Sequence, residues 1–383
     1  MKMKGFLYSM LLGAGLSLQG APLSVQASIV GDVWEEREAA QQNMWTSVVR
    51  SASGRLIAVS QDGTDRVMIS DDNGDTWASR TAAAQNVWTS IIRSSSGRLI
   101  AVAITGTHQV MISDDDGDNW SAVSAATASA WFAVMQSSSG RLVAVAISGT
   151  DGVMVSDDDG NTWAARTAAE LNLWTSLVQT TTGRLVAVSA SGTNRVMISD
   201  DDGDSWQSVS APQSGWRSLT QSSSGRLVAV AHDGIDRVMY SDDDGDTWTS
   251  AIAAEQNSWA SVTQSTTGRL VAVSLDGTDR VMVSDDDGEV WDERDAAAAQ
   301  VAWYQVINAN AGRLVAVGGA SVSGEFVMIS DGEAPPPFNS INYSYDALGR
   351  IIGAEYAGGP NDGLTIEYQY DAAGNRTEVV VDD

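Results

Sequence analysis

The sequence predicts an all-β fold, a seven-bladed β-propeller followed by a small C-terminal β appendage. Self-similarity carries the prediction, because the string Gly-Arg-Leu recurs seven times with its arginines 43, 43, 43, 42, 43 and 44 residues apart. All 14 tryptophans fall into two series of seven that follow the same period. No segment shows a sustained helical period. The repeated arginines are Arg55, Arg98, Arg141, Arg184, Arg226, Arg269 and Arg313.

Each unit contains four short β-type runs. In the first unit these runs cover residues 45–51, 55–60, 66–70 and 75–80, and they are rich in Val, Ile, Thr and Trp. The connections contain Gly and Asp, which supply the positive φ angles and local side-chain caps of tight hairpins. Four antiparallel strands per unit, repeated seven times, are typical of a β-propeller.

The two ends of the repeat array are complementary. Residues 31–34 form only the tail of a unit, a fourth strand without the first three, whereas the last unit has three strands and stops near Ser330. Pairing the two ends completes a seventh blade, closes the ring and removes two open sheet edges. A linear β-solenoid, the alternative, gains nothing from matched ends.

The N-terminal segment has the pattern of a signal peptide over residues 1–27. A basic start precedes 13 apolar residues, and Val25 and Ala27 precede Ser28 in a small-residue cleavage pattern. The apolar run falls short of the about 20 residues that span a bilayer. We therefore expect a secreted or periplasmic bacterial protein that is not an integral membrane protein, with the propeller over 28–332. An uncleaved membrane anchor is the alternative.

Composition excludes some functions. The formal net charge is −27, and the only lysines are Lys2 and Lys4. Such a field repels phosphate backbones, which disfavours nucleic-acid binding. The chain has no cysteine, so it contains no disulfide framework and no Cys-ligated zinc.

The connection between the third and fourth strands carries the motif S-x-D-x-G-x-x-W. Six complete copies hold 22 of the 49 acidic residues, so close to half of the negative charge is a repeated feature of this turn. The motif resembles that of the Asp-box (bacterial neuraminidase repeat) propellers, which include sialidases, sortilin-like receptors and a photosystem II assembly factor family. The resemblance covers about residues 31–334 and implies that the box is a structural hairpin at the propeller rim. The six copies begin at Ser70, Ser113, Ser156, Ser199, Ser241 and Ser284.

A cation site is the alternative interpretation of these boxes. Each box places several carboxylates within five residues, and a bound calcium ion would offset the repulsion between them. The boxes lack the ligand spacing of an EF-hand, however, and no other cofactor is expected. The candidate calcium ligands are Asp72, Asp115, Asp158, Asp201, Asp243 and Asp286.

The sequence shows no recognisable set of catalytic residues. The resemblance to sialidases implies an arginine triad, a Tyr–Glu pair and an acid/base Asp, but the F/Y-R-I-P string of the first arginine does not occur. The Arg of Gly-Arg-Leu is equivalent in all seven units, which favours a structural pairing with an Asp of a neighbouring turn. His108 and His232 lie in loops between second and third strands, without a nucleophile signature nearby. Short loops without insertions favour binding over catalysis.

The first-strand tryptophans are the candidate ligand contacts. Seven equivalent indoles near the channel resemble a multivalent sugar-stacking arrangement, and Tyr304 is a candidate for the channel lining. The alternative is that the indoles fill the gaps between blades. We predict a monomeric, non-catalytic binding module for a glycan or an extracellular protein. A sialidase-like or other glycan-acting hydrolase and a structural or assembly scaffold are the alternatives. The series is Trp45, Trp88, Trp131, Trp174, Trp216, Trp259 and Trp303.

A Pro-rich linker at 333–338 precedes a C-terminal appendage at 339–383. Tyr343-Ser-Tyr345-Asp346 and Tyr368-Gln-Tyr370-Asp371 resemble YD (RHS) repeats, which in long arrays wind into shells around toxin cargo. Two copies are too few to enclose anything. A small β-meander that docks onto the disc or onto another YD-repeat surface is predicted instead.

Overall fold

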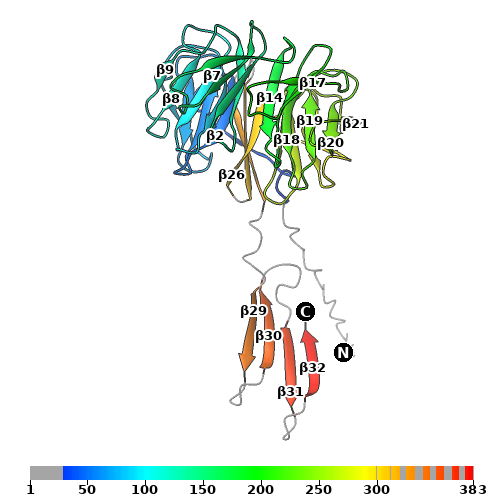
Figure 1. Cartoon of the computed structure of the whole chain (residues 1–383). Coiled ribbons are helices and arrows are strands. Elements are labelled where there is room, and N and C mark those ends of the chain that lie inside the picture. Colours follow the sequence, from blue (N-terminus) through cyan, green and yellow to red (C-terminus); the bar gives the residue numbers. More distant parts are fainter. Residues whose placement is uncertain are drawn as a thin grey trace, which may run out of the picture.

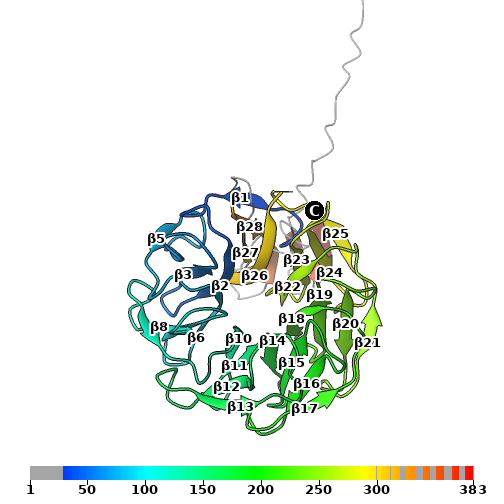
Figure 2. The same ribbon diagram turned by 90° about the horizontal axis from the view of Figure 1, so that it is seen from above.

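The structure is a computed structural model that describes residues 29–298, 300–310, 312–319, 325–332, 340–345, 351–357, 365–370 and 376–382. Seven four-stranded antiparallel sheets stand around a common axis, seen from the side in Figure 1 and along the axis in Figure 2. The predicted seven-bladed propeller is confirmed. The described residues contain no helix, and therefore no helix that could cross a membrane.

The first strand of each unit lies innermost, and the later strands follow outwards (Figure 2). The innermost strands are β2 (Trp45–Arg50), β6 (Trp88–Arg93), β10 (Trp131–Gln136), β14 (Trp174–Gln179), β18 (Trp216–Gln221), β22 (Trp259–Gln264) and β26 (Ala302–Asn310). The second strands are β3 (Leu56–Ser60), β7 (Leu99–Ala103), β11 (Leu142–Ala146), β15 (Leu185–Ser189), β19 (Leu227–Ala231), β23 (Leu270–Ser274) and β27 (Arg313–Gly319).

The outer half of each blade consists of the third and fourth strands. The third strands are β4 (Val67–Ser70), β8 (Val110–Ser113), β12 (Gly152–Ser156), β16 (Val196–Ser199), β20 (Val238–Ser241), β24 (Val281–Ser284) and β28 (Val327–Asp331). The fourth strands are β5 (Ala78–Arg80), β9 (Ser121–Val123), β13 (Ala164–Thr167), β17 (Gln207–Val209), β21 (Thr249–Ala251), β25 (Asp292–Arg294) and β1 (Glu35–Arg37).

The ring closes as the sequence predicts, because β1 pairs antiparallel with β28 and completes the seventh blade. The closure also rebuilds an Asp box from the two ends of the array. The Gly31 N–H donates to Ser330 Oγ at 2.8 Å, and Trp34 Nε1 donates to the Gly31 carbonyl at 3.1 Å. These are the bonds of the complete boxes, so six boxes are continuous in the sequence and a seventh is assembled across the closure.

The core lies between the blades. The second strands are buried along their length, and each first-strand tryptophan packs where two blades meet. Trp88, for example, contacts a cluster containing Ile57 and Val59 from blade 1 and Leu99 and Met111 from blade 2. Large wedges at these positions fill the space that opens between radially arranged sheets, and this burial contributes most of the favourable free energy of folding.

Each Asp box is a closed hairpin of local hydrogen bonds. In the first box, the Gly74 N–H donates to Ser70 Oγ at 2.8 Å, and the Ser70 hydroxyl donates to Asp72 Oδ1 at 2.8 Å. Trp77 Nε1 donates to the Gly74 carbonyl at 3.0 Å. Asn73 and Gly74 have φ angles of 58° and 97°, a conformation that Asn, Asp and Gly adopt most readily.

The repeated arginine holds neighbouring blades together. Arg184 Nε lies 2.7 Å from Asp200 Oδ1 of its own blade, and Arg184 Nη1 lies 2.7 Å from Asp246 Oδ1 of the next blade. These two carboxylates raise the pKa of Arg184 above its ordinary value. The expected pairing with an Asp of a neighbouring turn is therefore present.

We expect the propeller to lose stability steeply below about pH 4. Burial alone would raise the pKa of Asp243, but hydrogen bonds from Thr247 and Ser241 outweigh it and lower the pKa. The pKa of the equivalent aspartate is lowered in four other boxes. In these boxes the folded-state pKa lies below the unfolded value of about 3.9. Each ionised carboxylate therefore contributes its full stabilisation above a pH of about 3.9, and that stabilisation is lost as the pH falls through the folded-state pKa.

Urea unfolding between pH 6 and pH 2.5 measures this dependence. Asp243→Asn should flatten the acid limb of the curve, since one of the five linked carboxylates is gone. An acid limb for Asp243→Asn that parallels the parent would contradict the assignment.

The C-terminal residues form a separate four-stranded meander. Its strands pair in chain order and antiparallel, as predicted. They are β29 (Ser340–Tyr345), β30 (Ile351–Ala357), β31 (Thr365–Tyr370) and β32 (Arg376–Asp382). The predicted signal peptide (1–27), the linker (333–338) and the turns of the two YD-like motifs (346–350 and 371–375) lie outside the described residues. The resemblance of this appendage to YD repeats stays a prediction.

Candidate functional site

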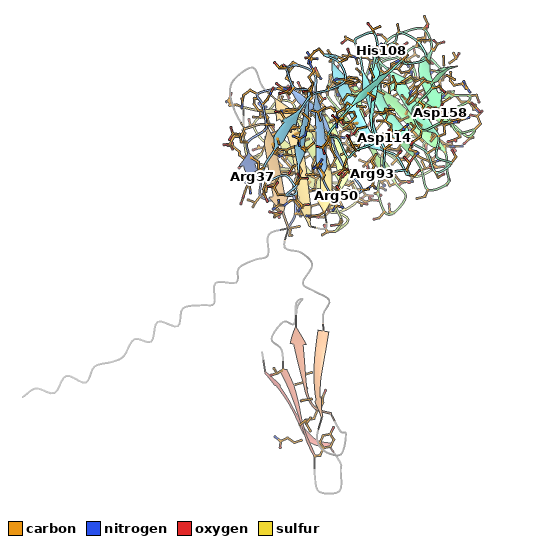
Figure 3. All side chains as sticks on the ribbon, turned by 90° about the vertical axis from the view of Figure 1, so that its left-hand side faces the viewer. Arg37, Arg50, Arg93, His108, Asp114 and Asp158 are labelled. Atoms are coloured by element: carbon orange, nitrogen blue, oxygen red, sulfur yellow. The ribbon has the colours of Figure 1, made fainter. Side chains whose placement is uncertain are left out.

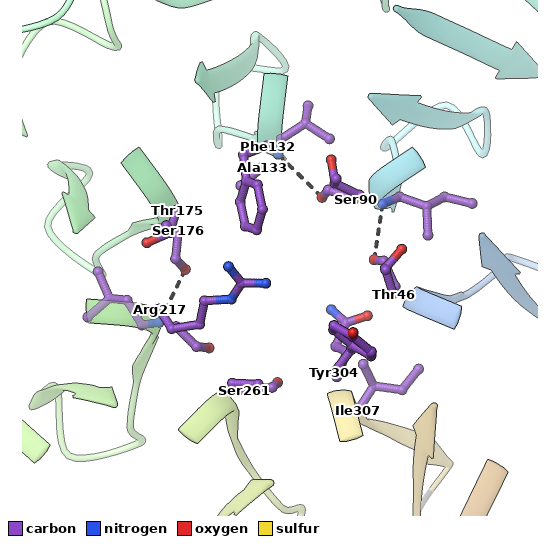
Figure 4. A pocket seen from close by; sticks show the side chains of 18 of the residues that line it. Thr46, Ser90, Phe132, Ala133, Thr175, Ser176, Arg217, Ser261, Tyr304 and Ile307 are labelled. Atoms are coloured by element: carbon purple, nitrogen blue, oxygen red, sulfur yellow. Dashed lines mark hydrogen bonds between the residues drawn. The ribbon is translucent and has the colours of Figure 1, made fainter. Parts of the chain in front are cut away.

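A cavity of about 280 Å³ lies on the propeller axis and is lined by the innermost strands of all seven blades. Three of its side chains are larger than the rest, namely Phe132 on β10, Arg217 on β18 and Tyr304 on β26. Figure 4 shows all three pointing into the open space. The prediction that Tyr304 lines the channel agrees with its placement.

The three residues occupy one position of the repeat, immediately after the first-strand tryptophan. Blades 1, 2 and 4 have threonine there, and blade 6 has Ala260. The threonine hydroxyls join neighbouring blades: Thr46 Oγ1 donates to the Trp88 carbonyl at 2.8 Å, and Thr175 Oγ1 to the Trp216 carbonyl at 2.7 Å. Blades 3, 5 and 7 lack this threonine and its hydrogen bond, and each places a large side chain in the channel instead.

Among the described residues, Arg217 is the only charged side chain that lines the cavity. Its guanidinium carbon lies 4.6 Å from the centre of the Phe132 ring, and it makes no hydrogen bond or ion pair with any described residue. Burial lowers the pKa of Arg217, although Tyr304 opposes that shift. An arginine remains protonated even so, and its five N–H donors face the cavity without an acceptor.

Tyr304 keeps its proton at neutral pH. Burial raises the pKa of its hydroxyl, while the positive charge of Arg217 opposes the shift. The hydroxyl lies 3.9 Å from Met44 Sδ. Arg217 and Tyr304 are the only titratable side chains that the described part of the chain contributes to the cavity, so these residues present hydrogen-bond donors rather than a general base.

Unpaired positive charge is concentrated on the innermost strands. Among the arginines of the described propeller residues, only Arg50, Arg93 and Arg217 make neither a hydrogen bond nor an ion pair, and each belongs to an innermost strand. Arg50 and Arg93 end β2 and β6 and lie toward the opposite face of the disc from His108 (Figure 3). In a chain with a net charge of −27, the axis is therefore the place that attracts anions.

The placement of the first-strand tryptophans does not support the prediction that they contact a ligand. All seven are 0% exposed, so no ring face is open to a sugar. In six of them the indole N–H donates to the backbone carbonyl four residues earlier, as from Trp45 to Gln41 at 3.0 Å. These rings occupy the gaps between blades, which is the alternative that the sequence left open.

The two histidines lie outside the cavity. His108 is exposed, and its Nδ1 lies 3.1 Å from Ser124 Oγ. His232 Nδ1 lies 2.8 Å from the Gly215 carbonyl, and Nε2 lies 3.6 Å from Asp233 Oδ2. Neither ring is among the residues that line the channel.

The aspartates proposed as calcium ligands accept bonds from their own turn. Asp243 Oδ1 accepts from Ser241 and from the Thr247 N–H, and Oδ2 accepts from Thr247 Oγ1 at 2.6 Å. Among the described residues, no three His, Cys, Asp or Glu side chains come together in a way that could hold a metal ion. Calcium binding stays a prediction.

Sequence reasoning missed Arg217 and Phe132, although a signal was present. Aligning the seven units at the first-strand tryptophan gives Thr, Thr, Phe, Thr, Arg, Ala and Tyr at the next position. This column varies more in size and charge than the strand positions around it. That column forms a ring around the axis, which is where asymmetry gives a symmetric disc a distinct binding site.

The fold and its turn motif define an Asp-box β-propeller. The family model of the photosynthesis system II assembly factor YCF48 matches residues 62–322, and the chain belongs to this family. No curated protein matches the chain.

Solved structures share the propeller fold. Virginiamycin B lyase from Staphylococcus aureus has a TM-score of 0.68 at 10% identity, covering 78% of this chain and 99% of the lyase. A structure of YCF48 bound to D1 peptide has a TM-score of 0.62 at 15% identity, covering 79% of this chain and 99% of that one. YCF48 from Cyanidioschyzon merolae has a TM-score of 0.60 at 14% identity, covering 78% and 98%. Identities this low show the fold alone.

Proposed function

We propose that this protein is a non-catalytic binding propeller that recognises a segment of another protein at its central channel, where Arg217 binds a carboxylate. From residues 1–27 we further propose that it acts as a secreted or periplasmic protein. The unpaired guanidinium of Arg217 carries the proposal.

The chemistry of the cavity suits a carboxylate. A guanidinium that stacks on an aromatic ring keeps its donors in a fixed plane, and a carboxylate accepts two of them in parallel. Phe132 holds Arg217 in this way, while Tyr304 adds a hydroxyl donor. The rest of the lining consists of serine and threonine hydroxyls, the amides of Gln61 and Gln305 and aliphatic side chains, so no lining carboxylate among the described residues competes with the ligand for Arg217.

A peptide fits these features better than a neutral glycan. The channel offers no exposed tryptophan face for sugar stacking, since the seven first-strand indoles are buried. About 280 Å³ is room for a chain terminus or one acidic side chain rather than for an oligosaccharide. The likeness to a YCF48 structure that contains D1 peptide supports a peptide ligand, at the level of the shared fold.

Hydrolysis is less well supported by the same cavity. Most glycoside hydrolases use a pair of carboxyl groups on either side of the scissile bond, and the residue set of the sialidases likewise includes a Glu and an acid/base Asp. The described residues that line the cavity include no Asp or Glu. The virginiamycin B lyase likeness, at 10% identity, adds no catalytic residue to this chain.

Fluorescence anisotropy with a matched pair of peptides tests the carboxylate contact. The probes are fluorescein-labelled Gly-Gly-Ser-Ala-Leu with a free C-terminal carboxylate and the same peptide as an amide. The acid should bind about 10- to 100-fold more tightly, the range that corresponds to about 1.5–3 kcal/mol for a charge-assisted hydrogen bond. Arg217→Thr installs the residue of blades 1, 2 and 4 and should abolish the preference.

Arg50→Gln is the matched control, because it removes another unpaired arginine from an innermost strand, at a position outside the cavity lining, and installs the residue that ends β10, β14, β18 and β22. It should leave the preference for the acid intact. Equal binding of acid and amide, or full binding by Arg217→Thr, would refute the proposal. Arg217-dependent binding of a uronic-acid disaccharide in place of the peptide would assign the site to an acidic glycan.

A further inference from the structure

A second feature lies on the outer surface of the disc, at the junction of blades 5 and 6. A groove of about 660 Å³ runs between β21 and the Asp-box turn that precedes β25. Its apolar surface includes Tyr240, Ile252 and Val290, of which Ile252 is 84% and Val290 62% exposed. Large apolar side chains left this open on a strongly acidic protein mark a candidate interaction surface.

The groove arises where blades 5 and 6 depart from the repeat. Ile252 stands where every other blade has Thr, Ser, Asp or Glu, and Val290 stands where the other five complete boxes have Thr, Asn or Ser. Tyr240 replaces the Ile or Val of the other third strands. Three residues that differ from the other blades therefore lie in one place. Ile252 and Val290 replace side chains that could hydrogen-bond with water, and Tyr240 is larger than the Ile or Val that it replaces.

Ala251 explains why the space is open. At four other junctions, an arginine at this position crosses from the fourth strand to an acidic residue of the next Asp box. Ala251 cannot cross, so among the described residues Glu289 keeps only the pairing with the repeated arginine, Arg226, at 3.3 Å. Arg226 also lies over the Tyr240 ring at 4.3 Å and so fixes the floor of the groove. The four crossing arginines are Arg37, Arg80, Arg166 and Arg294.

Charge indicates what the groove accepts. Glu289 and Glu293 line it, and no lysine occurs among the described residues. A second copy of this acidic chain would meet like charge, which disfavours self-association at this face. β21 is the outermost strand of its blade and carries no charged residue, so its free edge is open to an extended segment.

We propose that this groove binds an extended segment of a partner protein in which an aliphatic or aromatic side chain is flanked by Lys or Arg. The apolar side chain lies against Ile252 and Val290, and the flanking cations face Glu289 and Glu293. The groove shares no lining residue with the channel, so this inference goes beyond the carboxylate site and does not depend on it.

Four fluorescein-labelled peptides with amidated C-termini test the proposal by fluorescence anisotropy on the full chain. They are Gly-Ser-Lys-Leu-Lys-Ser-Gly and its counterparts in which Lys-Leu-Lys becomes Glu-Leu-Glu, Ser-Leu-Ser or Lys-Ser-Lys. The Lys-Leu-Lys peptide should bind at least about tenfold more tightly than each of the others, because it alone satisfies both the apolar and the acidic part of the groove.

The double variant Ile252→Thr, Val290→Thr restores residues found at these positions in other blades and changes no charge. It should weaken binding of the Lys-Leu-Lys peptide about tenfold. The matched control is Ile235→Thr, Val33→Thr, which removes the same residue types at 87% and 60% exposure elsewhere on the surface and should have no effect. Ala251→Arg should also block the groove.

The results of these binding measurements distinguish the groove from the alternatives. Equal binding of the four peptides, or equal weakening by the double variant and its control, would overturn the proposal. Arg217→Thr should leave binding of these amidated peptides unchanged, and weakening by that variant would assign them to the channel. The melting temperature of each variant shows whether a loss of binding reflects unfolding.

Discussion

Removing residues 29–38 should lower the free energy of unfolding by about 3–6 kcal/mol, counting about 1.5–3 kcal/mol for each large side chain that leaves the core. The segment contributes Val30 and Trp34, which are 2% and 7% exposed, and the whole of β1. It also contributes Asp32, whose Oδ1 lies 2.7 Å from Arg269 and 2.8 Å from Arg294. Without Asp32, the largely buried Arg269 loses one of its two carboxylate partners.

Urea unfolding measures the loss, and complementation identifies its cause. A synthetic peptide of residues 29–38 added in excess should restore most of the stability, because it can pair with β28 and rebuild the seventh Asp box. The same peptide with Trp34→Ala is the control and should restore much less. A truncated chain that is as stable as the parent would show that the ring does not depend on its closing strand.

Trp259→Ala should lower the free energy of unfolding by about 3–5 kcal/mol, the usual cost of removing a buried aromatic ring from a core. Trp259 is 0% exposed and packs with Val228 and Val230 of blade 5 and with Leu270 of blade 6. Its removal leaves a cavity between two sheets. Both sheets are held in the closed ring and therefore cannot move together to fill the cavity. The indole N–H bond to the Glu255 carbonyl, at 3.0 Å, is lost as well.

Trp248→Ala is the matched control from the other tryptophan series. Trp248 is only partly buried and closes a single Asp-box hairpin through its bond to Gly245 at 3.0 Å. We expect a clearly smaller loss, measured by the same urea unfolding. If Trp259→Ala were as stable as the parent but bound ligand less well, the first-strand tryptophans would be ligand contacts after all and the wedge assignment would be wrong.

Much of the fold follows from local patterns that repeat. The spacing of Gly-Arg-Leu and of the tryptophans predicts the number of blades, and the complementary ends predict that β1 completes the last one. The equivalence of the repeated arginine in every unit predicts a structural role, which the ion pairs of Arg184 bear out. These predictions succeed because the same local sequence pattern of strands and turns occurs in seven copies.

The candidate sites were less accessible to the same reasoning. Periodicity shows that Trp45 and its equivalents are large and regularly placed, but not whether a ring faces a neighbouring blade or the solvent. That choice depends on the distance between sheets, a property of the closed ring. Arg217, Phe132 and Tyr304 lie 85 and 87 residues apart in the chain and meet only because closure brings their strands to one axis.

The sequence alone therefore specifies a closed seven-bladed disc with a repeated acidic turn, since each unit contains its own strands, turns and wedges. Tertiary structure alone shows that a single unpaired arginine stands in the channel and that Ala251, Ile252 and Val290 open a groove on the rim. The physical reason is that repeats fix local hydrogen bonding and packing, whereas a binding site requires residues from different blades to converge. Closure of the ring supplies that convergence.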